Sequence, residues 1–287
     1  MSDYEKYPDM SAPDQGIDPR TRRRTVPMKV MNLSMIRTGT TSLQRALETL
    51  GVAPVAHGFT ICNQSRDLVM WQQGMRAKWW PLPDDRPFGR KEFDNLLGQY
   101  EGLSDWPCIA FSEELIAAYP EAKVIIVERE VESWYKSFKT TVTSNVFWPV
   151  FYYIAMLDYH HLGQFQIMTR MLVEGWFKAT NQEQFERNAK QVYKEHYENI
   201  KRWTPKERLL VFNLQDGWEP LCKLLNVPIP DVPFPRINDS DELQRRINVS
   251  LKISMTRVLK KAGLFLSVAE WCHMLRGESK QYRIKDD

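Results

Sequence analysis

The 287-residue chain lacks several features that would place it in a common class of protein. Its formal net charge is only +3 with 26% charged residues, a balance that does not favour nucleic-acid binding. It has no run of eighteen apolar residues and no apolar signal region at its start, so we expect a cytoplasmic protein without a membrane span. The G-x-x-x-x-G-K-[ST] loop is also missing, which disfavours a nucleoside triphosphate kinase or ATPase.

Cysteine is scarce and scattered. Cys62, Cys108, Cys222 and Cys272 form no C-x-x-C pair, and no Cys/His spacing suits zinc. We therefore expect reduced, mostly buried thiols and no metal site. The length of the chain fits one large α/β domain or two small ones.

The strongest functional signal lies in residues 29–50, KVMNLSMIRTGTTSLQRALETL. This pattern predicts a buried strand, a tight loop and an amphipathic helix. The unpaired N–H groups at a helix N-terminus bind phosphate, glycine lets the backbone approach it, and neighbouring hydroxyls add donors. The predicted anion-binding residues are Arg37, Thr38, Gly39, Thr40, Thr41 and Ser42. An ordinary Ser/Thr helix cap after a strand is the alternative.

A second strand-to-helix junction makes the first more specific. Residues 123–127, KVIIV, predict a parallel strand, and Glu128 and Arg129 lead from it into a helical stretch. Ser137 lies eight residues beyond Arg129. Both junctions resemble the cofactor motifs of sulfotransferases that use 3′-phosphoadenosine 5′-phosphosulfate (PAPS). An ion pair between Arg129 and a neighbouring glutamate is the alternative.

The resemblance extends from about Lys29 to about Asp239. The segments that carry it are RTGTTSLQRALETLGV, FDNLLGQYEGLSDWPC, YPEAKVIIVEREVESWYKS and RLLVFNLQDGWEPLCKLLNVPIPDVPFPRIND. They are similar to a soluble, fungal and microbial branch of the sulfotransferases, unlike the membrane-anchored Golgi enzymes. The resemblance implies a P-loop-type α/β fold and transfer of a sulfuryl group from PAPS to a hydroxyl, with release of 3′-phosphoadenosine 5′-phosphate (PAP).

The same resemblance implies roles for individual residues. Arg37 would stabilise the phosphate that leaves, without help from a metal ion, and Arg129 with Ser137 would hold the 3′-phosphate. His57 follows the first helix, where relatives carry histidine or glutamate, and is the expected general base. A surface or capping role for His57 stays open. The reserve candidates for the base are Glu113, His160 and His161, and Asp105 is either a site residue or a turn residue.

Alternating strands and helices predict a three-layer fold, a parallel sheet flanked by helices. Further predicted strands are 107–111 and 209–213, and further predicted helices are 66–73, 93–100 and 112–119. We divide the chain into a mobile arm with a solvated arginine run (1–27), the catalytic domain (28–240) and an amphipathic helical extension (241–287). The domain carries a helical, aromatic-rich insertion at about 145–205.

The aromatic insertion and the extension leave alternatives open. The insertion is either core packing or a lid over a hydrophobic small-molecule acceptor. The extension, interrupted at Gly263, docks onto the domain or onto a second copy in a homodimer, in preference to a membrane surface. His196 is expected to face solvent or to cap helix packing, Arg236 reaches the cofactor or is structural, and Trp218 anchors a helix start. A protein that keeps the nucleotide site but catalyses another reaction, or only binds a ligand, is the main rival function.

Overall fold

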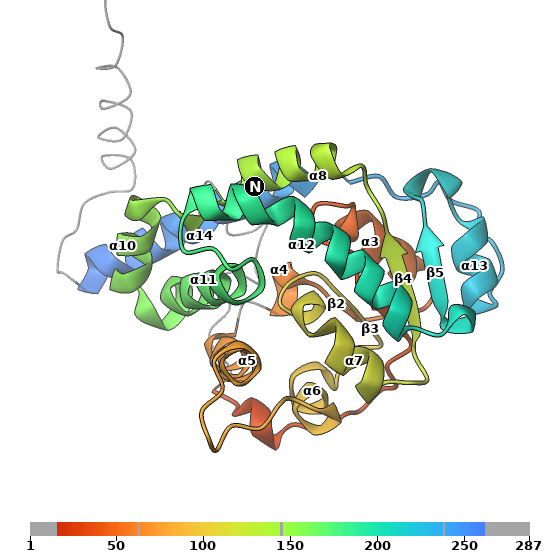
Figure 1. Ribbon diagram of the computed structural model, residues 1–287, viewed down its shortest axis with the longest axis horizontal. Coiled ribbons are helices and arrows are strands. Elements are labelled where there is room, and N and C mark those ends of the chain that lie inside the picture. The colour runs from red at the N-terminus through yellow and green to blue at the C-terminus, as the bar shows by residue number, and fades with distance from the viewer. Residues whose placement is uncertain (1–15, 62–63, 144–145, 238, 262–287) are drawn as a thin grey trace, which may run out of the picture.

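A computed structural model describes residues 16–61, 64–143, 146–237 and 239–261 of the chain. Its centre is a parallel sheet whose five described strands follow the order β2-β3-β1-β4-β5 (Figure 1). The strands are β1 Val30–Asn32, β2 Val55–Ala56, β3 Gly102–Ser104, β4 Lys123–Val127 and β5 Leu209–Phe212. The segment from residue 29 thus forms the central strand, as predicted.

Helices cover both faces of this sheet. The first half of the chain contains η1 Pro19–Thr21, α3 Thr40–Thr49, α4 Gly58–Ile61, α5 Ser65–Trp79, α6 Arg90–Leu97, η2 Cys108–Phe111, α7 Ser112–Ala118, α8 Val131–Phe138 and η3 Lys139–Thr143. The second half contains α10 Pro149–Leu157, η4 Tyr159–Gly163, α11 Gln164–Trp176, α12 Gln182–Trp203, η5 Lys206–Arg208, η6 Leu214–Asp216, α13 Glu219–Leu225 and α14 Asp239–Lys261. The segments η3 and η4 are single π-helical turns.

Alternation along β4 separates the core into two layers, because successive side chains of a strand point to opposite faces. Val124 and Ile126 pack with residues of α6, α7 and α12. Ile125 and Val127 pack on the other face with residues of α3 and α13. The prediction of a three-layer α/β fold, with a helical insertion and a helical C-terminal segment, is confirmed.

The predicted strand at 107–111 is wrong. Cys108–Phe111 forms the 3-10 turn η2, and the strand lies earlier in the chain, at Gly102–Ser104. A short apolar run fits a buried helical turn as well as a strand, and glycine at the start of β3 weakens the strand signal. The consequence is that Asp105, which directly follows β3, lies at the carboxyl edge of the sheet.

The arginine run at 20–24 is only partly the solvated cluster that we predicted, because Arg20 and Arg23 are exposed but Arg22 and Arg24 are paired with the domain. Arg22 Nη1 lies 2.7 Å from Asp67 Oδ2 of α5, and Arg24 pairs with Asp94 of α6. Side chains with carboxylate partners on two helices attach this part of the predicted arm to the domain. Residues 1–15 lie outside the described residues.

Two cysteine thiols are described, Cys108 and Cys222; both are buried, and neither is in a disulfide bond. Burial raises the pKa of the Cys222 thiol, which makes it less reactive. Cys62, Cys272 and Gly263 lie outside the described residues. No helix of the described ranges is both long and apolar enough to cross a membrane.

Candidate functional site

The carboxyl ends of four strands supply the predicted site residues. The anion-binding loop follows β1, His57 follows β2, Asp105 follows β3, and Arg129 lies two residues beyond β4. In a parallel sheet these ends meet at one edge, where ligands of open α/β folds bind. Because β2 pairs with β3, His57 and Asp105 emerge side by side.

The backbone of the anion-binding loop is shaped for close approach. Gly39 adopts φ 92° at the start of α3, and a Cβ atom there would come within 2.3 Å of Leu214 Cδ1. Arg37 also has a positive φ, 69°, and its residue is only 8% exposed. The first intrahelical bond of the loop region runs from Leu43 N–H to the Gly39 carbonyl, so the preceding N–H groups point out of the helix N-terminus.

The hydroxyls of the loop have different partners. Thr38 Oγ1 donates to the Met35 carbonyl at 2.7 Å and so stabilises the loop itself. Ser42 Oγ accepts the Ile237 N–H at 2.9 Å and can still donate to an anion. Thr41 lines the neighbouring cavity, as does Thr40.

Arg129 and Ser137, the two residues predicted to hold the 3′-phosphate, have different partners in the structure. The Arg129 guanidinium donates to Ser133 Oγ at 2.8 and 3.1 Å and to the Arg37 carbonyl at 3.0 Å. Ser137 Oγ instead accepts from Arg37 Nε at 3.4 Å. Ser137 follows Ser133 by four residues, one turn along α8. Two arginines and two serines therefore surround one region beside the helix N-terminus, a suitable arrangement for a dianionic phosphate.

A buried polar network below the loop was not predicted. Asn32 Nδ2 donates to Ser104 Oγ at 2.8 Å, and Asn32 Oδ1 accepts the Ser34 N–H at 3.2 Å. Ser34 Oγ accepts the Val127 N–H at 2.7 Å. This network connects β1, β3 and β4 directly under the loop. Polar residues inside an otherwise apolar strand were the available sequence signal.

Helix α12 holds the same loop from the other side. Tyr197 OH donates to the Val127 carbonyl at 2.7 Å and accepts the Met35 N–H at 3.1 Å. The Tyr193 hydroxyl bonds both backbone groups of Arg129. Of the two positions that we considered for His196, facing solvent is wrong: the residue is 5% exposed within the packing of α12, and its Nε2 lies 2.7 Å from the Leu33 carbonyl. Burial lowers the pKa of His196 to about 4.

His57 lies between the loop and a cavity. Its residue is 1% exposed, its Nδ1 lies 3.2 Å from Asp105 Oδ2, and its Nε2 lies 3.2 Å from Thr40 Oγ1. Asp105 also accepts the Trp106 backbone N–H, through Oδ1, at 2.6 Å. An imidazole held between a carboxylate and a hydroxyl has the geometry of a general base with a fixed orientation.

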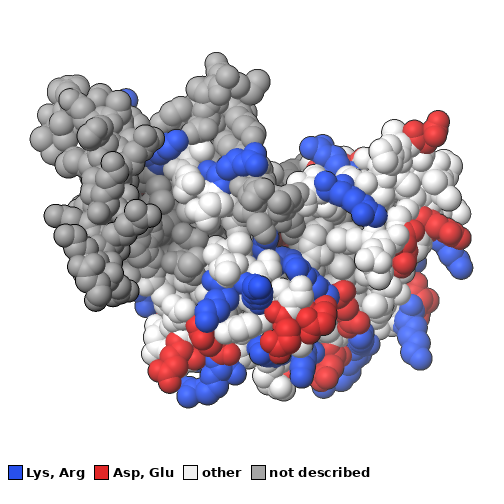
Figure 2. Space-filling model, turned by 90° about the horizontal axis from the view of Figure 1, so that it is seen from above, with Lys and Arg blue, Asp and Glu red and all other residues white. Residues whose placement is uncertain are grey.

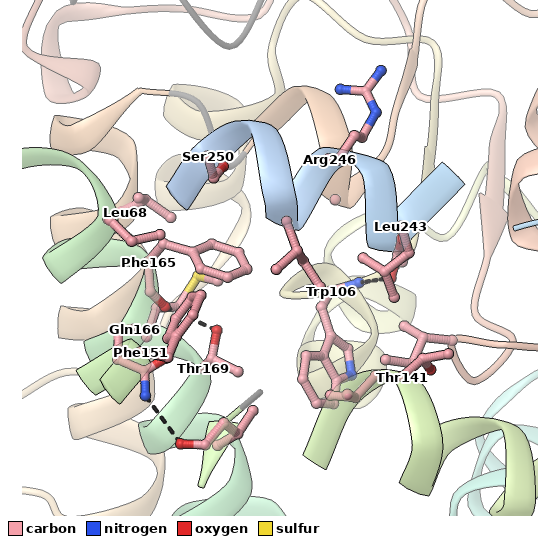
Figure 3. A pocket seen from close by; sticks show the side chains of 18 of the residues that line it. Leu68, Trp106, Thr141, Phe151, Phe165, Gln166, Thr169, Leu243, Arg246 and Ser250 are labelled. Atoms are coloured by element: carbon pink, nitrogen blue, oxygen red, sulfur yellow. Dashed lines mark hydrogen bonds between the residues drawn. The ribbon is translucent and has the colours of Figure 1, made fainter. Parts of the chain in front are cut away.

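The cavity beside His57 has a volume of about 210 Å³. In Figure 3, Phe151 and Phe165 lie on one side of it and Trp106 and Leu243 on the other, with α14 crossing it. Its remaining apolar walls come from Ile36, Leu68, Val142, Val146, Leu162, Met168, Ile247 and Ile253. The aromatic insertion therefore contributes both to the core, through Phe177, and to the cavity wall, through Phe151 and Phe165.

Helix α14 provides one wall of the cavity and packs against α10, η3 and η4. Arg257 Nη1 of α14 lies 3.5 Å from Asp158 Oδ2, whose side chain is 1% exposed. Within the described residues, neither carboxylate oxygen of Asp158 has a hydrogen-bond partner. The described part of the predicted extension is thus docked onto the domain of its own chain.

A family model described as a sulfotransferase domain matches residues 29–243. The chain belongs to the sulfotransferase family. It is 36% identical over 221 residues, 75% of this chain and 82% of the relative, to Ava biosynthesis cluster protein M of Aspergillus versicolor. A solved sulfotransferase from Alicyclobacillus acidocaldarius is 14% identical, with a TM-score of 0.40 over 84% of this chain and 98% of that one.

The other candidate residues of this sulfotransferase lie away from the cavity. Glu113 is exposed and lines a second pocket that does not include His57, and His160 is exposed beside Tyr159. The side chain of His161 lies outside the described part, as does His273. Within the described ranges, no cluster of three or more His, Cys, Asp or Glu side chains is arranged to hold a metal ion.

Two predicted loop residues of the sulfotransferase have clear positions. Trp218 immediately precedes α13, donates from Nε1 to the Val232 carbonyl at 2.7 Å and packs on Phe234, consistent with a helix-start anchor. Arg236 is exposed in the segment that leads to Ile237 and the loop contact at Ser42. On the face seen in Figure 2, basic and acidic side chains of the described residues are interspersed.

Proposed function

We propose that this sulfotransferase transfers a sulfuryl group from PAPS to a hydroxyl of a hydrophobic small molecule. One observation carries the proposal: the buried imidazole of His57 lies between the N-terminus of α3 and a largely apolar cavity. A polyanionic donor and an apolar acceptor can thus meet at a group suited to take the acceptor proton.

The residues at the anion-binding loop fit PAPS. The N-terminus of α3 suits the 5′-phosphosulfate, because its N–H groups point outward beside Arg37. The region bounded by Arg129, Ser133 and Ser137 suits the 3′-phosphate, which ADP and ATP lack. The loop also has no lysine of the kind that P-loop kinases use.

Bound PAPS supplies the sulfuryl group, whose bond to the phosphate oxygen breaks as a bond to the acceptor oxygen forms. His57 Nε2 accepts the proton of the acceptor hydroxyl. Arg37 and the α3 N-terminus stabilise the negative charge that develops on the phosphate of PAP, by analogy with phosphoryl transfer. Arginine does not release its proton near neutral pH, so its contribution is electrostatic.

The class of the acceptor is inferred from the cavity. Phe151, Phe165 and Trp106 give broad apolar surface, and polar groups near His57 and on α11 and α14 are placed around it. Such a cavity suits an aromatic or alicyclic alcohol or phenol. The name of the Aspergillus versicolor relative refers to a biosynthesis cluster, which agrees with a small-molecule acceptor.

Calorimetry with PAP, ADP and ATP tests the nucleotide part of the proposal, and incubation of PAPS with a panel of phenols tests the transfer. We expect PAP to bind at least tenfold more tightly than ADP, and an acceptor-dependent release of PAP. Equal affinities for PAP and ADP contradict the proposed donor. Tight PAP binding without transfer to any acceptor favours the rival, a protein that keeps the nucleotide site for another reaction or for binding alone.

A further inference from the structure

We propose that Asp105 is a positioning residue that fixes the tautomer of His57, with the ring proton on Nδ1 and the lone pair on Nε2. The inference rests on the proposed role of His57 as general base. It assigns to Asp105 a function in the reaction that is exerted through the imidazole of His57.

Each oxygen of the Asp105 carboxylate has one defined partner. Oδ1 accepts the Trp106 backbone N–H at 2.6 Å, and Oδ2 lies 3.2 Å from His57 Nδ1. An ionised carboxylate can only accept hydrogen bonds, so the proton of the contact with His57 belongs to Nδ1. The neutral imidazole then has its lone pair on Nε2, 3.2 Å from Thr40 Oγ1. A hydroxyl can donate to that lone pair, so both contacts are satisfied by one tautomer.

The surroundings fix the carboxylate in this position. Asp105 has φ 72°, a left-handed conformation that aspartate and asparagine tolerate better than most residues. At Gly58, a Cβ atom would lie 3.0 Å from Asp105 Oδ2 and 3.1 Å from the Trp106 carbonyl oxygen. The absence of a side chain at Gly58 therefore lets the carboxylate reach the buried imidazole.

This arrangement has a direct chemical consequence. Nε2 can accept the proton of the acceptor hydroxyl only while it carries the lone pair. The imidazolium formed in that step has the Asp105 carboxylate as its counter-charge, and Asp105 keeps its negative charge throughout. When Thr40 Oγ1 turns to the bound donor, Nε2 becomes available to the acceptor.

Asp105→Asn provides a sharp test because the new amide has only one oxygen. The Trp106 N–H needs that oxygen, so the amide NH₂ faces His57 Nδ1 and the ring proton moves to Nε2. Asparagine suits the positive φ, so the turn is kept. We expect transfer to slow by about 10²–10⁴-fold, the usual effect of losing a general base, while PAP affinity stays unchanged.

The ¹⁵N shifts of His57, assigned from the signals missing in His57→Gln, report the tautomer without any substrate. We expect Nδ1–H in the unmodified protein and Nε2–H in Asp105→Asn. Asp84→Asn, the same chemical change at an exposed loop position, is the matched control and should alter neither the shifts nor the rate. Nε2–H in the unmodified protein, or an unchanged tautomer in Asp105→Asn, overturns the proposal.

Gly58→Ala provides an independent variant if Asp105→Asn does not fold. The added methyl group displaces the carboxylate from Nδ1, so the preference for the Nδ1–H form should weaken; an unchanged preference contradicts the proposal. The tautomer measurement tests the role of Asp105, and the transfer assay tests the proposed function, so the two can fail separately. A protein with the Nδ1–H form and no transfer activity supports the role of Asp105 in fixing the tautomer and refutes the proposed function.

Discussion

The two halves of the site are held together by different forces. The nucleotide end is held by hydrogen bonds from Asn32 and Ser34 below the loop and from Tyr197 beside it. The cavity proposed for the acceptor has apolar walls from α5, α10, α11 and α14. Buried hydrogen bonds have strict geometry, whereas apolar packing accepts changes of shape at modest cost.

This difference suggests that the two parts of the sulfotransferase site have different functions. The geometry around the donor must be the same in each turnover, because charge develops at one place on the leaving phosphate. The cavity only has to exclude water and match the acceptor in shape. We therefore expect substitutions at the nucleotide end to change PAP affinity or stability, and substitutions in the cavity to change acceptor preference.

His57, where the two halves meet, should show the largest effect. His57→Ala removes the group that takes the acceptor proton, so we expect the transfer rate to fall by about 10²–10⁴-fold. PAP affinity and acceptor binding should change little, because many other residues form the loop and the cavity walls on either side of the His57 ring. Single-turnover rates and PAP calorimetry measure the two quantities separately.

The control for this variant is His160→Ala, an exposed histidine outside the cavity. It should retain the full transfer rate. If His57→Ala retained activity, the base would lie elsewhere and the two halves of the site would not meet at this residue.

The nucleotide end could be predicted from the sequence better than the cavity could. The loop at 37–42 and the helix after it were predicted because strand, turn and helix signals are adjacent in the chain and the chemistry depends on backbone groups. The strand before Arg129 was predicted from its apolar run, and the role of Arg129 came from the family resemblance. His57 depended on the family resemblance, since a two-residue strand such as β2 has no periodicity of its own.

The unpredicted features depend on contacts between distant segments. Asp105 meets His57 only because β2 pairs with β3, and His196 is buried only because α12 lies across the loop. The wall formed by α14 depends on docking far from its own sequence neighbours. No local pattern encodes such contacts, so propensity and periodicity cannot find them.

Acid should lower the free energy of unfolding through His196, the buried histidine that contacts the chain at the nucleotide end. Burial lowers the pKa of His196 from 6.5 to about 4, so between these values the unfolded chain binds the extra proton and the folded chain does not. The free energy of unfolding should therefore fall as the pH drops from 6.5 to 4, by up to about 3 kcal/mol from this residue, and then level off. Urea titrations at several pH values measure this fall. The free energy of unfolding of His196→Gln should decrease less between pH 6.5 and 4 than that of the unmodified protein, and that of His160→Gln should decrease by the same amount as in the unmodified protein. If the free energy of unfolding fell equally with pH in all three proteins, His196 would not be the source of the acid sensitivity.

Arg129 should have a smaller effect, limited to one ligand. Losing one charge-assisted contact costs on the order of 1.5–3 kcal/mol, so Arg129→Ala should weaken PAP binding by roughly 10- to 100-fold. ADP, which has no 3′-phosphate, should bind as before. Arg187→Ala, a change of the same charge at an exposed position of α12, is the control and should alter neither affinity. Calorimetry in which Arg129→Ala weakened PAP and ADP equally would remove the 3′-phosphate from this region.

The smallest effect is expected from the ion pair between Arg257 and Asp158, which attaches the α14 wall of the cavity to the domain. Arg257→Ala takes the counter-charge from Asp158, which stays buried at 1% exposure, while Arg257 itself is 29% exposed. Because that partial exposure weakens the pair, we expect a loss of about 1–3 kcal/mol in the free energy of unfolding. The double variant Asp158→Asn/Arg257→Ala should recover part of it, since no unpaired charge remains. The loosened α14 wall should raise the KM for a phenol acceptor and leave PAP affinity unchanged. If PAP affinity fell as much as acceptor affinity, the cavity and the nucleotide end would be one coupled unit, and the division between them would be wrong.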